Sequence, residues 1–260
     1  MECKKSRQDS KPARSIINAL GAAFRKGPDS AGILQGRRKF RSGRPHVWVS
    51  LVPSRKNGDV LMPCEGRLEA ALAKCLELDP DVSEYRCQPI RIKNPGGREF
   101  VIDFASRDRL GRYTLYDVKP FGKLDDPRVA NRMRTVRSRL SLAQLPHLVV
   151  TERELETDPQ RQVRDSLFRG LFITTTDYLK ARKAVLGELG RRSVCVGEAR
   201  RIAVRNDAHP LLIERMVIDG QLNFSVSTLW SDYTNLEVFN ECDSKSAAGW
   251  CSIRDVRIGV

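Results

Sequence analysis

The sequence predicts an α/β fold with a mixed sheet, followed by a smaller domain of short helices and strands. Two observations support the first part of this prediction. Two apolar strands joined by a polar turn occupy residues 100–119, and the elements around them give the order helix, three strands, helix, strand. This order is typical of an α/β core with a mixed sheet. A change to short helices from about Glu152 supports the second part.

The stretch FVIDFASRDRLGRYTLYDVK, residues 100–119, carries the clearest strand signal. Val101, Ile102 and Phe104 give the first strand its apolar content, and the second strand runs from Tyr113 to Val118. Branched and aromatic residues of this kind favour strands. The segment 107–111 is polar and ends in glycine, which predicts a turn.

Two acids and a lysine lie among these apolar residues. Asp117 and Lys119 are two residues apart, so they point to the same face, and Asp103 lies in the other strand. An acid inside an apolar strand is unfavourable unless it is paired or binds a metal. Phosphodiester hydrolysis uses two carboxylates for a divalent cation and an ammonium group near the scissile phosphate. Acids near strand ends are also common without such a role, so the hairpin alone leaves a structural role open.

A helix is predicted at residues 65–78, EGRLEAALAKCLEL, and Asp79-Pro80 ends it. Glu65 and Glu69 are four residues apart and therefore on one side of this helix, with Glu69 next to the apolar stripe. On the helix alone, both are expected to be solvated glutamates. The stripe has helical spacing and consists of Leu68, Leu72, Cys75 and Leu76.

The remaining elements of the core are shorter. Those before the helix are a short helix at Ile16–Phe24, a strand at Val47–Val52, a turn at Pro53–Gly58 and a strand at Val60–Met62. Those after it are a strand at Val82–Ile92 bent at Pro89, a turn at Asn94–Gly97, a basic helix at Pro127–Leu142 and a buried strand at His147–Thr151.

The C-terminal part is predicted to hold three helices and then a small hairpin. This arrangement is typical of a winged helix, which holds DNA or serves as a protein-docking module. The helices are predicted at Thr176–Leu189, Arg192–Val204 and Pro210–Ile218, and the strands at Gln221–Thr228 and Asn235–Phe239. The tail from Glu241 carries little signal.

The charge is positive and uneven. The net charge is +14, and residues 1–60 hold 14 Lys and Arg against 4 Asp and Glu. A strongly basic segment favours a polyanion such as nucleic acid, with a solvated tail as the alternative. No run of 18 apolar residues and no secretory signal is present, so we expect a cytoplasmic protein that does not span a membrane. Seven scattered cysteines without a C-x-x-C motif make a zinc site unexpected and favour reduced thiols.

Four short motifs, RLEAAL, CQPIRI, VIDF and YDVKP, follow one another in this chain. Their order and spacing resemble the PD-(D/E)xK nuclease core. More narrowly, the region from about Arg44 to Phe239 is similar to the TnsA family, the endonuclease subunit of heteromeric cut-and-paste transposases. The stretches LELDPDVSEYRCQPIRI and VVTERELETDP share this likeness. The resemblance implies a catalytic core followed by a C-terminal winged-helix-like domain.

The resemblance also implies site residues. By position, Glu69 matches the helix acid of the family, Asp103 the strand acid, and Asp117 with Lys119 the (D/E/Q)-x-K pair. The three acids would hold Mg²⁺ or Mn²⁺, Glu69 directly or through water, and one or two ions remain open. Lys119 would orient the attacking water or neutralise developing charge.

Two further residues are carried over with smaller roles. Gln88 of the Gln-Pro dipeptide recurs in the family and is expected to support the strand that carries Asp103. Glu65 is the second choice for the helix acid, because Gly66-Arg67 stand where family members often have small or polar residues between two glutamates.

The implied domains are a basic arm (1–43), an endonuclease domain (44–151), a winged-helix-like domain (152–240) and a tail (241–260). The implied function is cleavage of the 5′ (non-transferred) strand at transposon ends, leaving a 5′-phosphate and a 3′-hydroxyl. The implied partners are double-stranded DNA, a recombinase-type transposase subunit and an ATPase regulator subunit, in a bacterial, nucleoid-associated setting.

Two other functions stay open at this point. One is a stand-alone PD-(D/E)xK nuclease of phage, restriction or repair type, which would cut without partners. The other is a non-catalytic DNA-binding module whose acids are structural, which would keep its function after Asp103→Ala.

Overall fold

The structure is a computed structural model of the 260-residue chain and describes residues 11–38, 48–93, 97, 99–155, 160–173, 178–190, 192–224 and 229–238. The predicted tail, part of the N-terminal arm and most of the Asn94–Gly97 turn lie outside the described residues. The chain divides into two compact units near residue 155, and the short segment Leu78–Pro80 is grouped with the second.

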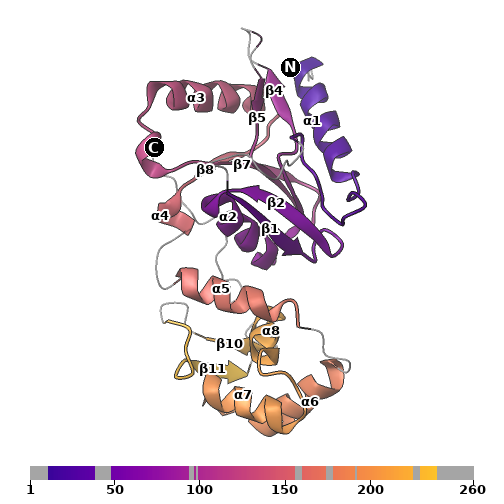
Figure 1. Ribbon diagram of the computed structural model, residues 1–260, viewed down its shortest axis with the longest axis vertical. Coiled ribbons are helices and arrows are strands. Elements are labelled where there is room, and N and C mark those ends of the chain that lie inside the picture. The colour runs from indigo at the N-terminus through magenta and orange to yellow at the C-terminus, as the bar shows by residue number, and fades with distance from the viewer. Residues whose placement is uncertain are drawn as a thin grey trace, which may run out of the picture. The chain divides into compact units, whose positions relative to one another are not determined.

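The first unit contains the predicted α/β core (Figure 1). Its helices are α1 (Lys11–Phe24), α2 (Arg67–Leu78), α3 (Pro127–Leu142), α4 (Glu152–Leu155) and a 3-10 turn η1 (Phe121–Lys123). Its strands are β1 (Val49–Ser54), β2 (Val60–Glu65), β3 (Val82–Cys87), β4 (Arg91–Lys93), β5 (Glu99–Val101), β6 (Phe104–Asp108), β7 (Tyr113–Val118) and β8 (His147–Val150).

The main sheet has the order β3-β6-β7-β8. The pairs β3–β6 and β6–β7 are antiparallel, whereas β7 and β8 are parallel and are connected through α3. A parallel pair needs such a crossover, usually a helix. The prediction of an α/β core with a mixed sheet is therefore confirmed. Two hairpins, β1–β2 and β4–β5, form separate two-stranded sheets.

Helices α1 and α3 pack on one face of the main sheet. Leu20 and Phe24 of α1 meet Val136 and Leu140 of α3 over Leu115 of β7, and all five are buried. Because side chains alternate along a strand, Phe104 and Tyr116 point to the opposite face. The basic helix predicted at Pro127–Leu142 is confirmed with the same bounds, and its inner face is apolar.

The N-terminal region is more than a basic arm. Helix α1 is part of the core of the first unit, and Leu20 has no exposed surface. Arg86 of β3 donates to the carbonyl oxygens of Ala23 and Phe24 at the end of α1, at 3.3 and 2.8 Å. Residues 11–38 therefore belong to the first unit, and the prediction that they form part of a separate basic arm is corrected.

The predicted helix at residues 65–78 begins two residues later. Glu65 is the last residue of β2, and Gly66 has a φ of +96°, a conformation that suits glycine. The sequence predicted that Glu65 and Glu69 lie on one side of a helix. This prediction is wrong, because Glu65 lies in β2 and only Glu69 lies in α2. The apolar stripe is buried at Leu72, Cys75 and Leu76.

Two predicted strands are interrupted. The strand predicted at Val82–Ile92 ends at Cys87, and β4 then pairs with β5 instead of β6. The strand expected around Val101–Phe104 is likewise split into β5 and β6, with Ile102 and Asp103 between them. Arg107 and Asp108, predicted to start the turn, still belong to β6. The two interruptions lie side by side, because the backbone N–H of Gln88 donates to the carbonyl oxygen of Asp103 at 2.7 Å.

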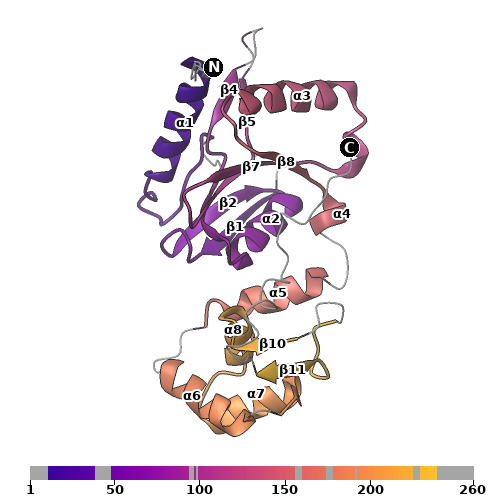
Figure 2. The ribbon, with the colours of Figure 1, turned by 180° about the vertical axis from the view of Figure 1, so that it is seen from behind.

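The second unit contains three helices and a hairpin in the predicted order (Figure 2), but the helix predicted from Arg192 begins at Val196, after a short strand. Its elements are α5 (Gln160–Gly170), α6 (Tyr178–Leu189), β9 (Val194–Cys195), α7 (Val196–Arg205), α8 (Leu212–Ile218), β10 (Leu222–Asn223) and β11 (Asn235–Val238). Helix α5 and strand β9 were not predicted. The three strands form an antiparallel sheet of order β10-β11-β9.

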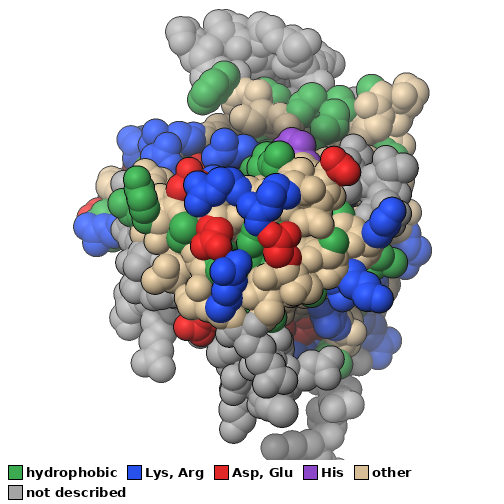
Figure 3. All heavy atoms as spheres, turned by 90° about the horizontal axis from the view of Figure 1, so that it is seen from below, with side chains coloured by type: hydrophobic (Ala, Val, Ile, Leu, Met, Phe, Trp, Pro, Cys, Tyr) green, Lys and Arg blue, Asp and Glu red, His purple; other side chains and the backbone are tan. Residues whose placement is uncertain are grey.

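Seen from below, basic side chains on this face are interspersed with acidic ones (Figure 3). Several arginines of the second unit are paired with acids, including Arg205 with Glu188 and Arg192 with Glu198. Among the described residues, Cys64, Cys75, Cys87 and Cys195 form no disulfide. Among the helices of the described residues, none combines the length and the apolar character needed to cross a membrane.

The carboxylate of Asp108 accepts hydrogen bonds from the backbone N–H groups of Leu110 and Arg112 across the β6–β7 turn. Burial by itself would raise the pKa of Asp108, but hydrogen bonds from the backbone and side chain of Arg112 and from the backbone N–H of Leu110 lower it from 3.8 to about 2. A depressed pKa in the folded state adds stability above the unfolded-state pKa, and this stability is lost as pH falls through the folded-state value.

We therefore expect Asp108→Asn to lower the free energy of unfolding at pH 7 by about 1 kcal/mol, after allowance for solvent screening. The difference between the two proteins should shrink between about pH 4 and pH 2. Urea unfolding followed by circular dichroism at several pH values measures it. A difference that stays constant down to pH 2 would contradict the role of the carboxylate charge.

Candidate active site

Asp103, Asp117 and Lys119 meet at one end of the main sheet. The β6–β7 register pairs Phe104 with Tyr116, so the residues just beyond this pair, Asp103 and Asp117, are neighbours across the two strands. The Lys119 Nζ lies 2.6 Å from Asp103 Oδ2 and 3.4 Å from Asp117 Oδ1. Asp103 Oδ2 also accepts a 2.8 Å hydrogen bond from the backbone N–H of Val118. Two carboxylates therefore converge on one ammonium group.

Asp117 has no exposed surface and is surrounded by donors. Arg132 Nη2 from α3 lies 3.0 Å from Asp117 Oδ1, and His147 Nε2 from the start of β8 lies 2.9 Å from Oδ2. The His147 side chain is 1 % exposed. A buried charge is tolerated when it is paired and hydrogen-bonded in this way.

The two aspartates differ in their electrostatics. Burial would raise the pKa of Asp117, but the hydrogen bond from His147 and the charges of Lys119 and Arg132 outweigh burial and hold that pKa below its ordinary value. For Asp103, burial and the charge of Asp117 raise the pKa against the opposing effect of Lys119. Asp117 is thus the more firmly ionised of the pair.

Glu69 lies at the first turn of α2, close to this pair. Its Oε2 accepts a 2.7 Å hydrogen bond from the backbone N–H of Glu65. Burial first, and then the nearby charge of Asp103, raise the pKa of Glu69 to about 8. The charge of Asp103 therefore acts on Glu69, whose hydrogen bond goes to the backbone of Glu65. Glu65, the second choice for the helix acid, contributes its backbone N–H to Glu69, and its own carboxylate is ion-paired with Arg38 at 3.7 Å.

Gln88 supports Asp103 through the backbone. Its N–H holds the Asp103 carbonyl at 2.7 Å, and its own carbonyl accepts from the N–H of Arg37 at 2.9 Å. Gln88 is buried and has a φ of +46°, which is uncommon for a residue with a side chain. Gly36 packs against it so closely that a Cβ on Gly36 would lie 2.7 Å from the Cβ of Gln88 and 2.7 Å from the carbonyl oxygen of Cys87. The bend that carries Gln88 is therefore tightly constrained.

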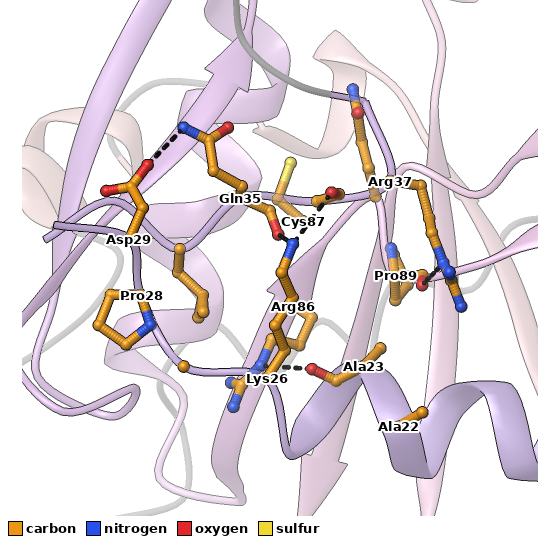
Figure 4. A pocket seen from close by; sticks show the side chains of 14 residues that line it. Ala22, Ala23, Lys26, Pro28, Asp29, Gln35, Arg37, Arg86, Cys87 and Pro89 are labelled. Atoms are coloured by element: carbon orange, nitrogen blue, oxygen red, sulfur yellow. Dashed lines mark hydrogen bonds between the residues drawn. The ribbon is translucent and has the colours of Figure 1, made fainter. Parts of the chain in front are cut away.

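A cavity of about 690 Å³ lies beside this bend (Figure 4). Three cations line it, but each donates to backbone carbonyl oxygens. Lys26 donates to Gln35, Arg37 to Pro89, and Arg86 to the end of α1. These donors hold the loop after α1 against the sheet. We therefore assign the cavity a structural role and place the candidate chemistry at Asp103 and Asp117.

Carboxylate oxygens are the ligands that Mg²⁺ and Mn²⁺ prefer, but the point that Asp103 and Asp117 both face is occupied by Lys119 Nζ. Within the part of the chain that the structure describes, no group of three or more His, Cys, Asp and Glu is arranged to hold a metal. Metal binding by Asp103 and Asp117 therefore stays a prediction. The predicted participation of Glu69 in metal binding stays a prediction.

Two residues of this site were missed by sequence reasoning. In the sequence, Arg132 belongs only to the basic helix predicted at Pro127–Leu142, and His147 only to the strand predicted at His147–Thr151. A signal for Arg132 existed, because it precedes the buried residues Val136 and Leu140 by four and eight positions and so lies on the inner face of the helix. For His147, the parallel pairing of β7 with β8 was needed.

The sequence was compared with known proteins. No protein-family model matches it, and no curated protein is significantly similar to it.

The close packing at Gly36 predicts that the Gln88 bend is sensitive to a single methyl group. We expect Gly36→Ala to lower the free energy of unfolding by about 1–3 kcal/mol, because the backbone of Cys87 and Gln88 has to move. Gly27→Ala is the matched control, since a Cβ there meets nothing within 4 Å. Its effect should stay within about 0.5 kcal/mol. Urea unfolding of both variants measures this, and equal midpoints would contradict the constraint.

Proposed function

We propose that this protein is a metal-dependent DNA endonuclease. The observation that carries the proposal is the convergence of Asp103 and Asp117 on Lys119 at the end of a mixed sheet. These groups suit phosphodiester hydrolysis, in which carboxylates hold a divalent cation and a lysine stands near the reacting phosphate.

The order of elements supports the same proposal. The first unit runs α2, β3, β6, β7, α3, β8, with Asp117 on β7 and Asp103 directly before β6. This is the arrangement that the resemblance to the PD-(D/E)xK core implies. In the second unit, the order α6, β9, α7, α8, β10, β11 and the sheet order β10-β11-β9 support a winged-helix-like domain.

Each residue has a distinct part in the proposed reaction. When bound, the cation activates water and stabilises charge on the phosphate. Asp103 and Asp117 would hold it, and Glu69 would complete the site directly or through water. Lys119 orients the attacking water or neutralises charge that develops on the phosphate oxygens. Gln88 keeps the Asp103 backbone in place.

The exposed arginines of α3 are the proposed DNA contacts. Arg128, Arg134 and Arg137 are exposed, whereas Arg132 is turned toward Asp117. Exposed guanidinium groups on this helix suit the phosphates of duplex DNA.

In the second unit, helix α8 is poorly placed to enter a groove of DNA. Five of the seven residues of α8 are buried. A Cβ on Gly170 of α5 would lie 2.5 Å from the Cβ of Glu214, so α5 packs directly on α8. Arg215 of α8 is engaged by Asp219 at 3.0 Å. These contacts leave α8 with little free surface for groove recognition.

Within this class, we propose the transposase subunit that cleaves the 5′ strand at transposon ends, on the strength of the resemblance to the TnsA family. Its proposed partners are the transposon-end duplex, a recombinase-type subunit and an ATPase regulator, the last docking on the second unit. A stand-alone nuclease of the same fold and a non-catalytic DNA-binding module are the competing functions.

The first test is strand-specific cleavage of a duplex that carries the transposon end, with Mg²⁺ or Mn²⁺, and with or without a recombinase-type transposase subunit. We expect 5′-strand nicking that needs the metal and the recombinase. Asp103→Asn and Asp117→Ala should reduce it to background with DNA affinity nearly intact, and Lys119→Met should reduce it about 10²–10³-fold.

The outcomes separate the three functions. Nicking by the protein alone would support a stand-alone nuclease. DNA binding without cleavage in any mixture, unchanged in Asp103→Asn, would support the non-catalytic module. Equal loss of cleavage and binding in Asp117→Ala would contradict its role at the metal, provided that circular dichroism shows a folded protein.

DNA affinity should fall steeply with salt, because phosphate contacts release counterions. We expect Arg137→Ala to reduce the slope of log affinity against log salt by about 1. Arg109→Ala, in the exposed turn at the other end of β6 and β7, is the control and should leave the slope unchanged. Fluorescence anisotropy over a salt series measures both, and a flat salt response of the wild-type protein would contradict phosphate contacts.

A further inference from the structure

Trp48 is an exposed tryptophan at the end of the β1–β2 hairpin. Its side chain is 75 % exposed. Its carbonyl oxygen accepts a 2.8 Å hydrogen bond from the backbone N–H of Gly66, which extends the hairpin by one pair beyond Val49 and Glu65. A single exposed aliphatic side chain is ordinary, but tryptophan joins a large flat ring to an N–H donor and is enriched at binding surfaces. The direction in which this ring points therefore indicates what it can bind.

Side-chain alternation places Trp48 on the inner face of the hairpin. In the β1–β2 register, Val52 pairs with Met62 and Ser50 pairs with Cys64, and Val52, Met62 and Cys64 are buried. Trp48 is the next residue in this row. Because its side chain is exposed, its ring projects past the buried part of that face.

This end of the hairpin adjoins the candidate site. Gly66 directly precedes α2, and the backbone N–H of Glu65 donates to the carboxylate of Glu69 at 2.7 Å. Two hydrogen bonds through the dipeptide Glu65–Gly66 thus connect Trp48 with Glu69. The charge of Asp103 in turn acts on Glu69.

The candidate site is open to solvent on the Asp103 side. The side chains of Asp103 and Lys119 are 14 and 16 % exposed, whereas Asp117 has no exposed surface. A substrate therefore reaches Asp103 and Lys119 first. Since Asp103 is also the aspartate whose charge acts on Glu69, a strand bound there passes the start of α2 and Trp48.

Two arginines border the tryptophan. Arg38 is exposed and lies 3.7 Å from the carboxylate of Glu65, and Arg67 is the exposed first residue of α2. Arginine side chains contact phosphates, and an exposed aromatic ring stacks on a base. The combination is typical of surfaces that bind unpaired nucleic acid strands.

We infer that Trp48 stacks on an unpaired base next to the phosphate bound at the candidate site. The inference rests on the proposed function and adds the substrate class, which is DNA with an unpaired base at the point of cleavage. In an intact duplex the neighbouring bases cover the faces of each base and leave only its edges in the grooves. A tryptophan ring can stack only on a base that has left this arrangement.

The first readout needs no cleavage. Fluorescence anisotropy in EDTA measures the affinity for single-stranded oligothymidylate and for a fully paired duplex. We expect Trp48→Ala to weaken single-strand binding about tenfold, the loss of one base–aromatic stack, and to change duplex binding less than about twofold. Trp48→Phe keeps a stacking ring and should retain most of the affinity. Leu110→Ala is the matched control, because Leu110 is also 75 % exposed but lies in the turn at the other end of β6 and β7.

The second readout uses the cleavage assay. A mismatch beside the cleaved phosphate makes a base easier to unstack, so the wild-type protein should cut the mismatched duplex faster than the paired one. This preference should disappear in Trp48→Ala and persist in Trp48→Phe. A merely structural role of Trp48 would lower the cleavage of both duplexes alike. Trp48→Leu has apolar bulk without a flat ring, and it replaces Trp48→Ala if circular dichroism shows that Trp48→Ala is unfolded.

The outcomes separate the inference from the proposed function. Cleavage by the wild-type protein without a preference for the mismatch, or equal single-strand affinity of the wild-type protein and Trp48→Ala, would overturn the inference and leave the nuclease intact. A loss in Trp48→Ala that is confined to stimulation by the recombinase-type subunit would make Trp48 a protein contact and also overturn it. Neither DNA binding nor cleavage by the wild-type protein would overturn the proposed function as well.

Discussion

The fully buried carboxylate of Asp117 is the constraint on which much of the first unit depends. A charge without solvent has to be balanced by the protein. Here Lys119, directly after β7, and Arg132 on α3 supply positive charge, and His147 on β8 lies within hydrogen-bond distance. Removing one partner of such a buried pair costs about 3–5 kcal/mol. The crossover helix α3 is therefore held in place by the same contacts that shape the candidate site. A substitution among these contacts changes both the stability of the first unit and the geometry of the site.

The second constraint is the interruption of the sheet at Gln88 and Asp103. Strand β3 leaves the main sheet after Cys87, and β5 gives way to β6 around Asp103. The two breaks are joined by one backbone hydrogen bond and are covered by Gly36, where only a hydrogen fits. An uninterrupted strand would have kept Asp103 within a regular ladder. The break instead lets its carboxylate reach Lys119 and the backbone of Val118.

Features that depend on neighbouring residues were predictable from the sequence. The bounds of α3, the β6–β7 pair and the proximity of Asp103, Asp117 and Lys119 follow from periodicity and strand alternation. Features that depend on distant contacts were not. The exchange of strand partners at Cys87 needs β5, and the partnership of His147 with Asp117 needs the parallel β8. The helix start was missed because Gly66 permits a backbone turn that a propensity argument does not specify.

Helix α3 shows how one composition can serve two purposes. In the sequence, the arginines of α3 look alike. In the structure, Arg132 shares the inner face with Val136 and Leu140. Arg134 and Arg137 face solvent. An inward guanidinium acts at short range in a poorly solvated setting, where its pairing with a carboxylate is strong. Outward guanidinium groups act through a screened field that depends on salt. Loss of DNA affinity with salt and loss of the Asp117 environment are therefore separable properties of the same helix, and a variant has to be interpreted by the face on which its arginine lies.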